Sequence, residues 1–444
     1  MANIFSNKIV IIVILLLVVF LIFYWLYATY FIGEPEKWSI DGVSEYCKQE
    51  ASDITDLSPE DYPGEMKNII RTIDQWFALK ERKQLDTVEL KDEFIARAEK
   101  ITTLDGFFEV TLDLFSRMEN AHTQMIVPMY GRAMRAELIE GEPVVTAIKE
   151  DRLPAEISRD IKIEEGAVIE KIDGVPSREW LETRLPYFSS SNTHWDKHGA
   201  VEKLFLRYIF EEEVRSYQYR NTEGDTIEIE ISLDLPWNEA RIALEPPLVK
   251  HQAYEHIGYL AVNSLSEGVV EKFDKALKEL QDKESLILDL RQCRGGDSRL
   301  ADEIFRRFIQ TVKDVWTGVD GGKRVAEPYE ELNYHGELRV LIGPYTFSAA
   351  EGLAFDLYDA ERGVFVGGPT RGCSGGGPRT FMTEGGFVFR FPSRGVDYSA
   401  SGREMEGDGL APHIDVKQTM EDYLRGADTV LEYVLNELME RYPK

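Results

Sequence analysis

Cysteine is scarce in this chain of 444 residues, which contains three: Cys47, Cys293 and Cys373. An odd and sparse set does not describe a fold that disulfides hold together. Cys293 and Cys373 are the pair most worth testing for a bridge, and unpaired thiols packed as small apolar side chains are an equally good alternative. Folding must therefore rest on hydrophobic cores, for which 43% hydrophobic and 11% aromatic residues are ample.

Positive charge is also in deficit, with 51 Lys and Arg against 79 Asp and Glu and a formal net charge of −28. A nucleic-acid-binding surface needs a basic face that neutralises phosphates. The sequence therefore predicts no nucleic-acid partner. The acidic excess indicates solubility rather than a particular ligand.

Two familiar ligand motifs are missing. The glycine-rich segment 372–377 is not followed by Gly-Lys-Ser/Thr, which excludes a P-loop. His194 and His198 have the i, i+4 spacing of some zinc ligands, but the glutamate of His-Glu-x-x-His is absent and no third ligand can be named. We therefore expect no cofactor and no metal.

At the amino terminus, Ile9 to Ile32 is an apolar run without charge. Such a run can cross a hydrocarbon core of ~30 Å as a helix, whereas a cleaved signal peptide has an apolar region of only ~7–15 residues. Lys8 precedes the run and acidic residues follow it, so the positive-inside tendency places the short end in the cytoplasm. Residues 1–33 are predicted to be a cytoplasmic tip and transmembrane anchor, with residues 34–444 periplasmic or extracellular.

Residues 34–128 show apolar side chains at helical spacing, first over 65–79 and then over 86–100. A third helical stripe ends at a polar turn that carries His122. The pattern predicts a small helical domain with this histidine at its exit.

Residues 129–235 change to short β-like runs separated by turns, with a hairpin signature around 221–224. Residues 195–210 are predicted to be helical. The segment from Glu165 to Pro176 is similar to the central hairpin of a PDZ domain. This resemblance implies a PDZ-like domain, a fold that binds an extended peptide along a strand edge.

From residue 236 to residue 444, strands alternate with helices, which indicates an α/β layer with largely parallel strands. Functional residues in such layers gather at the carboxyl ends of the strands. The predicted strands are 257–263, 285–290, 338–343 and 363–367, and the predicted helices are 267–283, 297–312, 348–360 and 428–439.

Two of these strand ends carry chemistry. One strand runs into the glycine turn Gly295-Gly296, and the strand after it delivers Ser348 to the start of a helix. Free backbone N–H groups beside a hydroxyl are what acyl transfer needs, so Ser348 is a candidate nucleophile. A serine at the start of a helix is also a common N-cap. The small residues and glycines near Ser348 favour the catalytic alternative.

Several motifs, taken in chain order, resemble the C-terminal processing and tricorn-core serine peptidases. They are Asn120-Ala-His-Thr123, Leu288-Asp-Leu-Arg291 with Gly295-Gly296, Phe347-Ser-Ala-Ala-Glu351, Pro369-Thr-Arg-Gly-Cys-Ser-Gly375 and Glu406-Gly-Asp-Gly-Leu-Ala-Pro412. The resemblance implies a ClpP/crotonase-like α/β core with a mixed or parallel sheet, and polypeptide substrates.

This family has two layouts for the catalytic base. Processing peptidases use a lysine in the loop that corresponds to 370–377, where this chain has no lysine and Cys373 stands at the matched place. The tricorn-like layout uses a histidine with a glutamate behind it, and the resemblance assigns these roles to His122 and Glu406. His122 would act as the base, and Glu406 would fix the imidazole tautomer and stabilise the imidazolium.

The oxyanion hole expected for this chemistry is formed by the backbone N–H groups of Ala349 and of Gly295 or Gly296. The sequence departs from the family pattern at two positions. Ala121 precedes the histidine where that pattern often has serine, and His413 follows Pro412 where the family favours aspartate.

The sequence hypothesis is thus a membrane-anchored, extracytoplasmic serine peptidase that acts on proteins or unfolded peptides, with homo-oligomerisation left open. The main alternative is a peptidase-like protein without catalysis that binds peptides or lipophilic ligands. A cysteine hydrolase using Cys373 is disfavoured, because no strand-to-helix elbow presents that thiol. Glu404, on the same predicted strand face, is a rival to Glu406.

Overall fold

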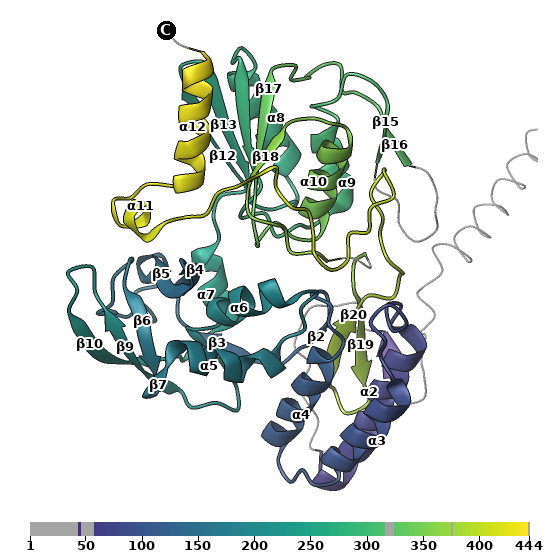
Figure 1. The fold of residues 1–444 in the computed structure, drawn as a ribbon. Helices are drawn as coiled ribbons and strands as arrows, with labels where there is room; N and C mark the ends of the chain where they lie inside the picture. The colour runs from purple at the N-terminus through teal and green to yellow at the C-terminus, as the bar shows by residue number, and fades with distance from the viewer. Residues whose placement is uncertain (1–42, 46–56, 316–323, 374–375, 443–444) are drawn as a thin grey trace, which may run out of the picture.

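The computed structural model describes residues 43–45, 57–315, 324–373 and 376–442. The apolar run 9–32 and Cys47 lie outside these ranges, so the predicted anchor stays a prediction. Across the ranges that are described, no helix is both long and apolar enough to cross a membrane. Figure 1 shows an α/β core at the top, a β-rich part at the lower left and a helical part at the lower right.

The strands of the core sheet are β12 (Val249–Tyr254), β13 (Ile257–Val262), β14 (Ser285–Asp289), β17 (Glu337–Ile342), β18 (Val364–Gly367) and β21 (Ile414–Asp415). They are ordered β12-β13-β14-β17-β18-β21, with β12 antiparallel to β13 and the other neighbours parallel. The mixed sheet of the sequence prediction is confirmed. Because β14 is buried along its whole length, it appears in the sequence as a continuous apolar run.

Helices cover both faces of this sheet: α8 (Val269–Leu280), α9 (Ser298–Phe305), α10 (Ala349–Asp359) and α12 (Thr429–Arg441). Successive strand residues point to opposite sides. Leu286 and Leu288 therefore share a core with α8, α9 and α10, whereas Ile287 packs with α12. α9 stops seven residues short of the predicted 297–312, because the Asn333 side chain donates to the carbonyls of Arg306 and Ile309 just beyond it.

The helical part contains α2 (Tyr62–Trp76), α3 (Thr87–Ala98) and α4 (Leu104–Ser116), as the apolar spacing predicts. Its core also includes a hairpin from far along the chain, β19 (Arg379–Thr383) and β20 (Val388–Phe391). β20 pairs with β2 (Gln124–Met125), directly after the turn that carries His122. The hairpin therefore attaches the end of the helical part to the α/β core.

The β-rich part has a sheet of β4 (Met134–Ile139), β5 (Glu142–Ile148), β6 (Val168–Ile172), β9 (Val214–Arg220) and β10 (Thr226–Ser232), in the order β10-β9-β6-β5-β4. The helices α5 (Ser177–Arg184) and α6 (Thr193–Glu202) pack on it. The β9–β10 hairpin matches the predicted signature.

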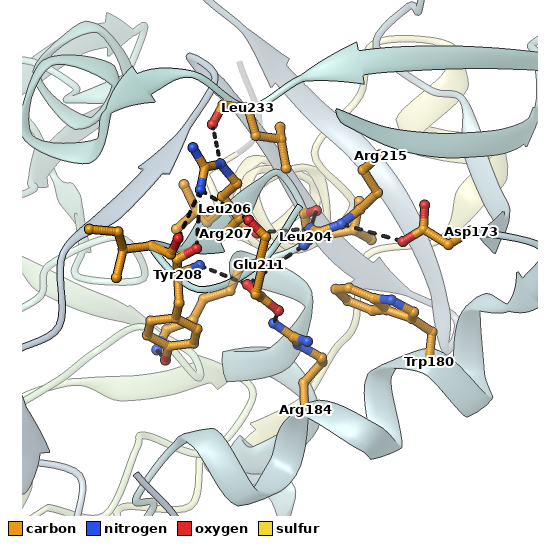
Figure 2. Close-up of polar contacts among 12 residues, drawn as sticks. Asp173, Trp180, Arg184, Leu204, Leu206, Arg207, Tyr208, Glu211, Arg215 and Leu233 are labelled. Carbon is orange, nitrogen blue, oxygen red and sulfur yellow. Dashed lines mark hydrogen bonds and ion pairs between the residues drawn. The ribbon is translucent and has the colours of Figure 1, made fainter. Parts of the chain in front are cut away.

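The helix predicted over 195–210 is wrong in its second half. α6 ends at Glu202, and the chain continues into the strand β8 (Leu206–Tyr208). Arg215 Nη1 donates to the carbonyls of Leu204 and Leu206 at 3.1 and 2.8 Å (Figure 2). These long-range bonds occupy the carbonyls that a continuing helix would need for itself.

Glu211 stands at the centre of the same network (Figure 2). Its carboxylate pairs with Arg184 and Arg215 and accepts the backbone N–H of Tyr208 at 2.7 Å. The Arg184 guanidinium in turn lies over the Trp180 ring, 4.9 Å from its centroid. The network fixes β8 against α5, and with it the position of the Tyr208 ring.

Candidate active site

Ser348 lies where β17 and its following turn meet α10. Its backbone has φ +58° and ψ −124°, a region that non-glycine residues enter only under strain of roughly 1–3 kcal/mol. The glycine turn lies directly against this residue: a Cβ at Gly295 (φ +82°) would stand 2.6 Å from the Phe347 carbonyl oxygen and 2.8 Å from Ser348 Cβ. Only glycine allows the two strand ends to approach this closely, so the glycine turn and the serine form one structure.

His122 lies in the turn between α4 and β2, and its Nε2 is 3.0 Å from Ser348 Oγ. The two residues are separated by 226 positions in the sequence. The Asn120 Oδ1 atom accepts the His122 backbone N–H at 2.9 Å, and the imidazole packs against the Phe347 ring at 4.8 Å between centroids. The structure thus brings together the serine and the histidine that the sequence singled out.

The other ring nitrogen, His122 Nδ1, lies 3.1 Å from Cys373 Sγ. Cys373 is buried, and burial, followed by the charges of Glu406 and Glu351, raises the pKa of its thiol well above the ordinary value. The thiol is therefore neutral at physiological pH, which suits a hydrogen-bond partner of an imidazole and not a nucleophile. Neither Cys293 nor Cys373 is in a disulfide, so the bridge considered from the sequence is not formed.

Glu406 is buried behind this histidine. Its Oε2 accepts from Asn120 Nδ2 at 3.0 Å, and its Oε1 is 2.7 Å from Lys83 Nζ. Asn120 therefore links the Glu406 carboxylate to the backbone of the histidine turn. The rival Glu404 lies elsewhere, with its Oε1 accepting from Arg82 Nε at 2.7 Å at the surface.

Glu351 was overlooked in the sequence, although it belongs to the serine motif. It is completely buried and accepts from Thr370 Oγ1 at 2.7 Å, from the Gly372 N–H at 2.6 Å and from the Cys373 N–H at 3.1 Å. It also accepts the Ser348 N–H at 3.1 Å. A carboxylate among small and apolar residues in the first turn of the helix was the available signal. This side chain fixes the loop that places Cys373 against the histidine.

The polar loop 189–192, for which the sequence suggested no role, also supports the site. Ser189 Oγ accepts the Asn120 N–H at 2.9 Å, and Ser191 Oγ accepts the Ala121 N–H at 3.2 Å. Asn192 Nδ2 donates to the carbonyls of Arg371 and Gly407 at 2.8 and 2.7 Å. The β-rich part thereby holds the histidine turn and the two loops behind it.

The predicted oxyanion donors lie on the glycine turn and at the start of α10. Gly296 is exposed and has φ +137°, and the turn is held by the Leu265 N–H donating to the Gly295 carbonyl at 2.9 Å. The Gly295 N–H is directed to the Cys293 sulfur. Within the described residues no acceptor takes the Gly296 or Ala349 N–H, which leaves these two donors for a ligand.

The comparisons with known proteins agree with this geometry. Residues 256–416 match the family model described as peptidase family S41. This part of the chain is a peptidase family S41 domain.

Within the described ranges, no three His, Cys, Asp or Glu side chains gather in a way that could hold a metal ion.

Two curated relatives are carboxyl-terminal-processing enzymes. The carboxyl-terminal-processing protease of Picosynechococcus sp. is 24% identical over 298 residues, 64% of this chain and 66% of that protein. Carboxyl-terminal-processing peptidase 3, chloroplastic, of Arabidopsis thaliana is 28% identical over 173 residues, 38% of this chain and 33% of that protein. The chain thus matches between about a third and two thirds of the length of these relatives.

Among solved structures, mature CPAF has a TM-score of 0.69 at 14% identity, covering 87% of this chain and 99% of that one. The photosystem II D1 C-terminal processing protease has a TM-score of 0.50 at 15% identity, covering 85% and 96%. At such identities the likeness shows a shared mixed α/β fold.

A cavity of about 240 Å³ borders the S41 domain beside the serine and the histidine. Its wall includes Ala121 and Thr123 on either side of His122, together with Phe347, which precedes Ser348. The cavity therefore borders the sequence neighbours of both catalytic candidates.

Proposed function

We propose that this protein is a serine peptidase that hydrolyses peptide bonds of proteins or unfolded peptides through an acyl-enzyme on Ser348. The observation that carries the proposal is the 3.0 Å contact between Ser348 Oγ and His122 Nε2, formed by segments from two different parts of the fold. The S41 domain and the carboxyl-terminal-processing relatives support the same reaction class.

In the first step, Ser348 Oγ attacks the carbonyl carbon while its proton passes to His122 Nε2. The negative charge on the carbonyl oxygen is stabilised by the N–H groups of Ala349 and Gly296, each such donor contributing about 3 kcal/mol to the barrier reduction. The C–N bond then breaks, and His122 gives its proton to the leaving amine. Water hydrolyses the ester by the reverse sequence, with its proton passing through His122 back to Ser348.

The imidazolium that forms needs stabilisation on its far side. Cys373 holds the ring at Nδ1, and the buried Glu406 supplies negative charge through the Asn120 turn. We assign both residues to positioning and electrostatic stabilisation of His122. In this assignment Glu406 keeps the electrostatic role that the sequence predicts, and Cys373 takes over the contact with Nδ1.

We further propose that residues 9–32 anchor the protein in a membrane with the peptidase outside the cytoplasm. Extraction of cell membranes with alkaline carbonate tests the anchor. External protease treatment of intact spheroplasts, in a separate experiment, tests the orientation. A carbonate-soluble protein contradicts the anchor, and protection from external protease contradicts the orientation.

The test of the reaction is hydrolysis of an unfolded protein by the full chain, compared with Ser348→Ala. Ser232→Ala is the matched control, because its hydroxyl donates to the exposed Glu213 in the β-rich part. Hydrolysis should vanish in the first variant and persist in the second. Equal activity in wild type and Ser348→Ala would remove the assignment. Absence of activity in all three would favour the alternative of a peptide-binding protein without catalysis.

A further inference from the structure

Two residues of the β-rich part face the strand ends that carry the oxyanion turn and the nucleophile. His198 and Glu202 lie one turn apart on α6, so their side chains share one face of the helix. The His198 imidazole meets the Tyr345 ring edge-on, with 6.1 Å between the ring centroids. The Glu202 carboxylate forms an ion pair with Arg294. This face of α6 therefore reaches both turns.

Arg294 immediately precedes Gly295-Gly296, so its side chain extends from the oxyanion turn itself. Its guanidinium lies over the Tyr345 ring, 5.1 Å from the centroid, in the turn that leads to the nucleophile. On the other side of Arg294, the Cys293 carbonyl accepts the Phe347 N–H at 3.1 Å. Arg294 thus lies where the two turns contact each other.

The Glu202 side chain is largely buried, with 17% of its surface exposed. Burial raises the pKa of its carboxyl, but the charge and hydrogen bond of Arg294, followed by the charges of Arg371 and Arg135, lower that pKa overall. Burial lowers the pKa of Arg294, and the charge and hydrogen bond of Glu202 outweigh this effect and raise it. Both partners are therefore ionised. Through Arg371, the Glu202 charge also acts on the loop that carries Cys373.

Glu202 is the last residue of α6, and the chain directly behind it is fixed. Arg215 Nη1 donates to the carbonyls of Leu204 and Leu206 at 3.1 and 2.8 Å (Figure 2). A carboxylate at the C-terminal end of a helix faces the negative end of the helix dipole, which is locally unfavourable. The cation that offsets this cost, Arg294, belongs to the α/β core. A fixed support and a partner in another part of the fold suit a residue that orients that other part.

We propose that Glu202 is a positioning residue of the active site, which holds the oxyanion turn Gly295-Gly296 in place through Arg294. The inference rests on the proposed function, because the turn stabilises an oxyanion only in a protein that performs acyl transfer. Without the Glu202 carboxylate, Arg294 loses the ion pair that ties the turn to α6. Oxyanion donors act in the transition state and not on bound substrate, so the loss should appear in kcat rather than in KM.

The kinetic test is hydrolysis of fluorescein-labelled casein, an unstructured protein, by the full chain. Glu202→Gln should lower kcat about tenfold and leave KM within about twofold of wild type, because a charge-assisted contact becomes a neutral one. Arg294→Gln should have the same effect, and Arg294→Lys, which keeps the positive charge, should retain most of the wild-type kcat. The control is Glu142→Gln, which removes an exposed ion pair with Arg178 in the same β-rich part and should leave kcat unchanged.

The double variant Glu202→Gln/Arg294→Gln shows whether the two residues act as one contact. Its kcat should be no lower than that of the slower single variant. A kcat of Glu202→Gln equal to wild type overturns the proposal. So do single losses that multiply in the double variant, and so does a loss confined to KM.

Amide hydrogen exchange, followed by mass spectrometry, tests the same claim without turnover. The Cys293 and Asp297 N–H groups, on either side of the glycines, donate to the carbonyls of Leu290 and Leu265 at 3.0 and 2.9 Å. Their exchange should be about tenfold faster in Glu202→Gln than in wild type and unchanged in the control variant. Exchange that is unchanged in Glu202→Gln overturns the proposal.

The two measurements separate this inference from the proposed function. A wild-type protein that does not hydrolyse casein contradicts the proposed function, and the exchange of the turn still decides whether Glu202 holds it. Faster exchange throughout the chain would mean that Glu202→Gln unfolds, and the comparison of Arg294→Gln with Arg294→Lys then takes its place. Equal kcat and equal exchange in those two variants overturn the proposal.

Discussion

The buried carboxyl of Glu351 gives the structure a specific dependence of stability on pH. Burial raises its pKa from the ordinary 4.5 to about 7, against the effect of its four hydrogen bonds. A folded carboxyl with a raised pKa binds its proton more tightly than the unfolded chain does. Its contribution to stability is therefore fully present below the unfolded pKa and is lost as the pH rises through the folded pKa.

The size of this contribution follows from the two pKa values. The whole effect is about 3 kcal/mol, of which about 2.5 kcal/mol disappears between pH 5 and pH 8. Glu351→Gln keeps the shape of the protonated side chain and cannot ionise. The stability of wild type relative to Glu351→Gln should therefore fall by about 2.5 kcal/mol over this interval.

The assay is urea unfolding of both proteins at pH 5, 6, 7 and 8, followed by tryptophan fluorescence. Glu271→Gln, on the exposed side of α8, controls for the loss of a negative charge and should run parallel to wild type. A wild-type-minus-variant difference that stays constant from pH 5 to pH 8, or that rises, would refute the reasoning that burial dominates at Glu351.

Substitutions at three further positions test the parts around the nucleophile. Cys373→Ala should lower kcat/KM by about two- to tenfold, because one neutral hydrogen bond at His122 Nδ1 is lost. Cys373→Ser should recover most of the lost kcat/KM. Equal kinetics in Cys373→Ala and Cys373→Ser would exclude a positioning role for Cys373. Glu406→Gln breaks the buried ion pair with Lys83 and should lower the free energy of unfolding in urea by about 3–5 kcal/mol, together with a fall in kcat. A free energy of unfolding unchanged from wild type would contradict the buried pair. Gly295→Ala should abolish activity, because its Cβ would stand 2.6 Å from the Phe347 carbonyl oxygen. The control Gly224→Ala, at φ +95° with nothing within 4 Å of the added Cβ, should lose only stability. Activity retained in Gly295→Ala would contradict the close approach of the two strand ends.

Much of the core could be predicted because its signals are local. β14 and β17 are short apolar runs bounded by turns, and Ser348 follows one of them beside small residues that permit a tight elbow. The histidine turn was found by resemblance, since nothing local distinguishes His122 from the other histidines. Its contact with Ser348 depends on how two distant parts of the chain pack.

The features that escaped prediction all depend on long-range contacts. The hairpin 379–391 completes the core of the helical part, and no local pattern shows where a hairpin will insert. The helix after Thr193 ends early because Arg215 takes its next carbonyls. The contact of Cys373 with His122 Nδ1 arises from a loop that Glu351 ties to the nucleophile helix, which only the assembled structure shows.

The most direct measurement of the central claim is the labelling of the full chain with a fluorophosphonate probe, with the modified residue located by mass spectrometry. A serine activated by a histidine reacts with such a probe, whereas an ordinary surface serine does not. The account predicts one modification, on Ser348, that is lost in His122→Ala and retained in His256→Ala, whose imidazole lies at the surface beside Glu284. Labelling that persists in His122→Ala, or no labelling of Ser348 in the wild-type protein, would contradict it.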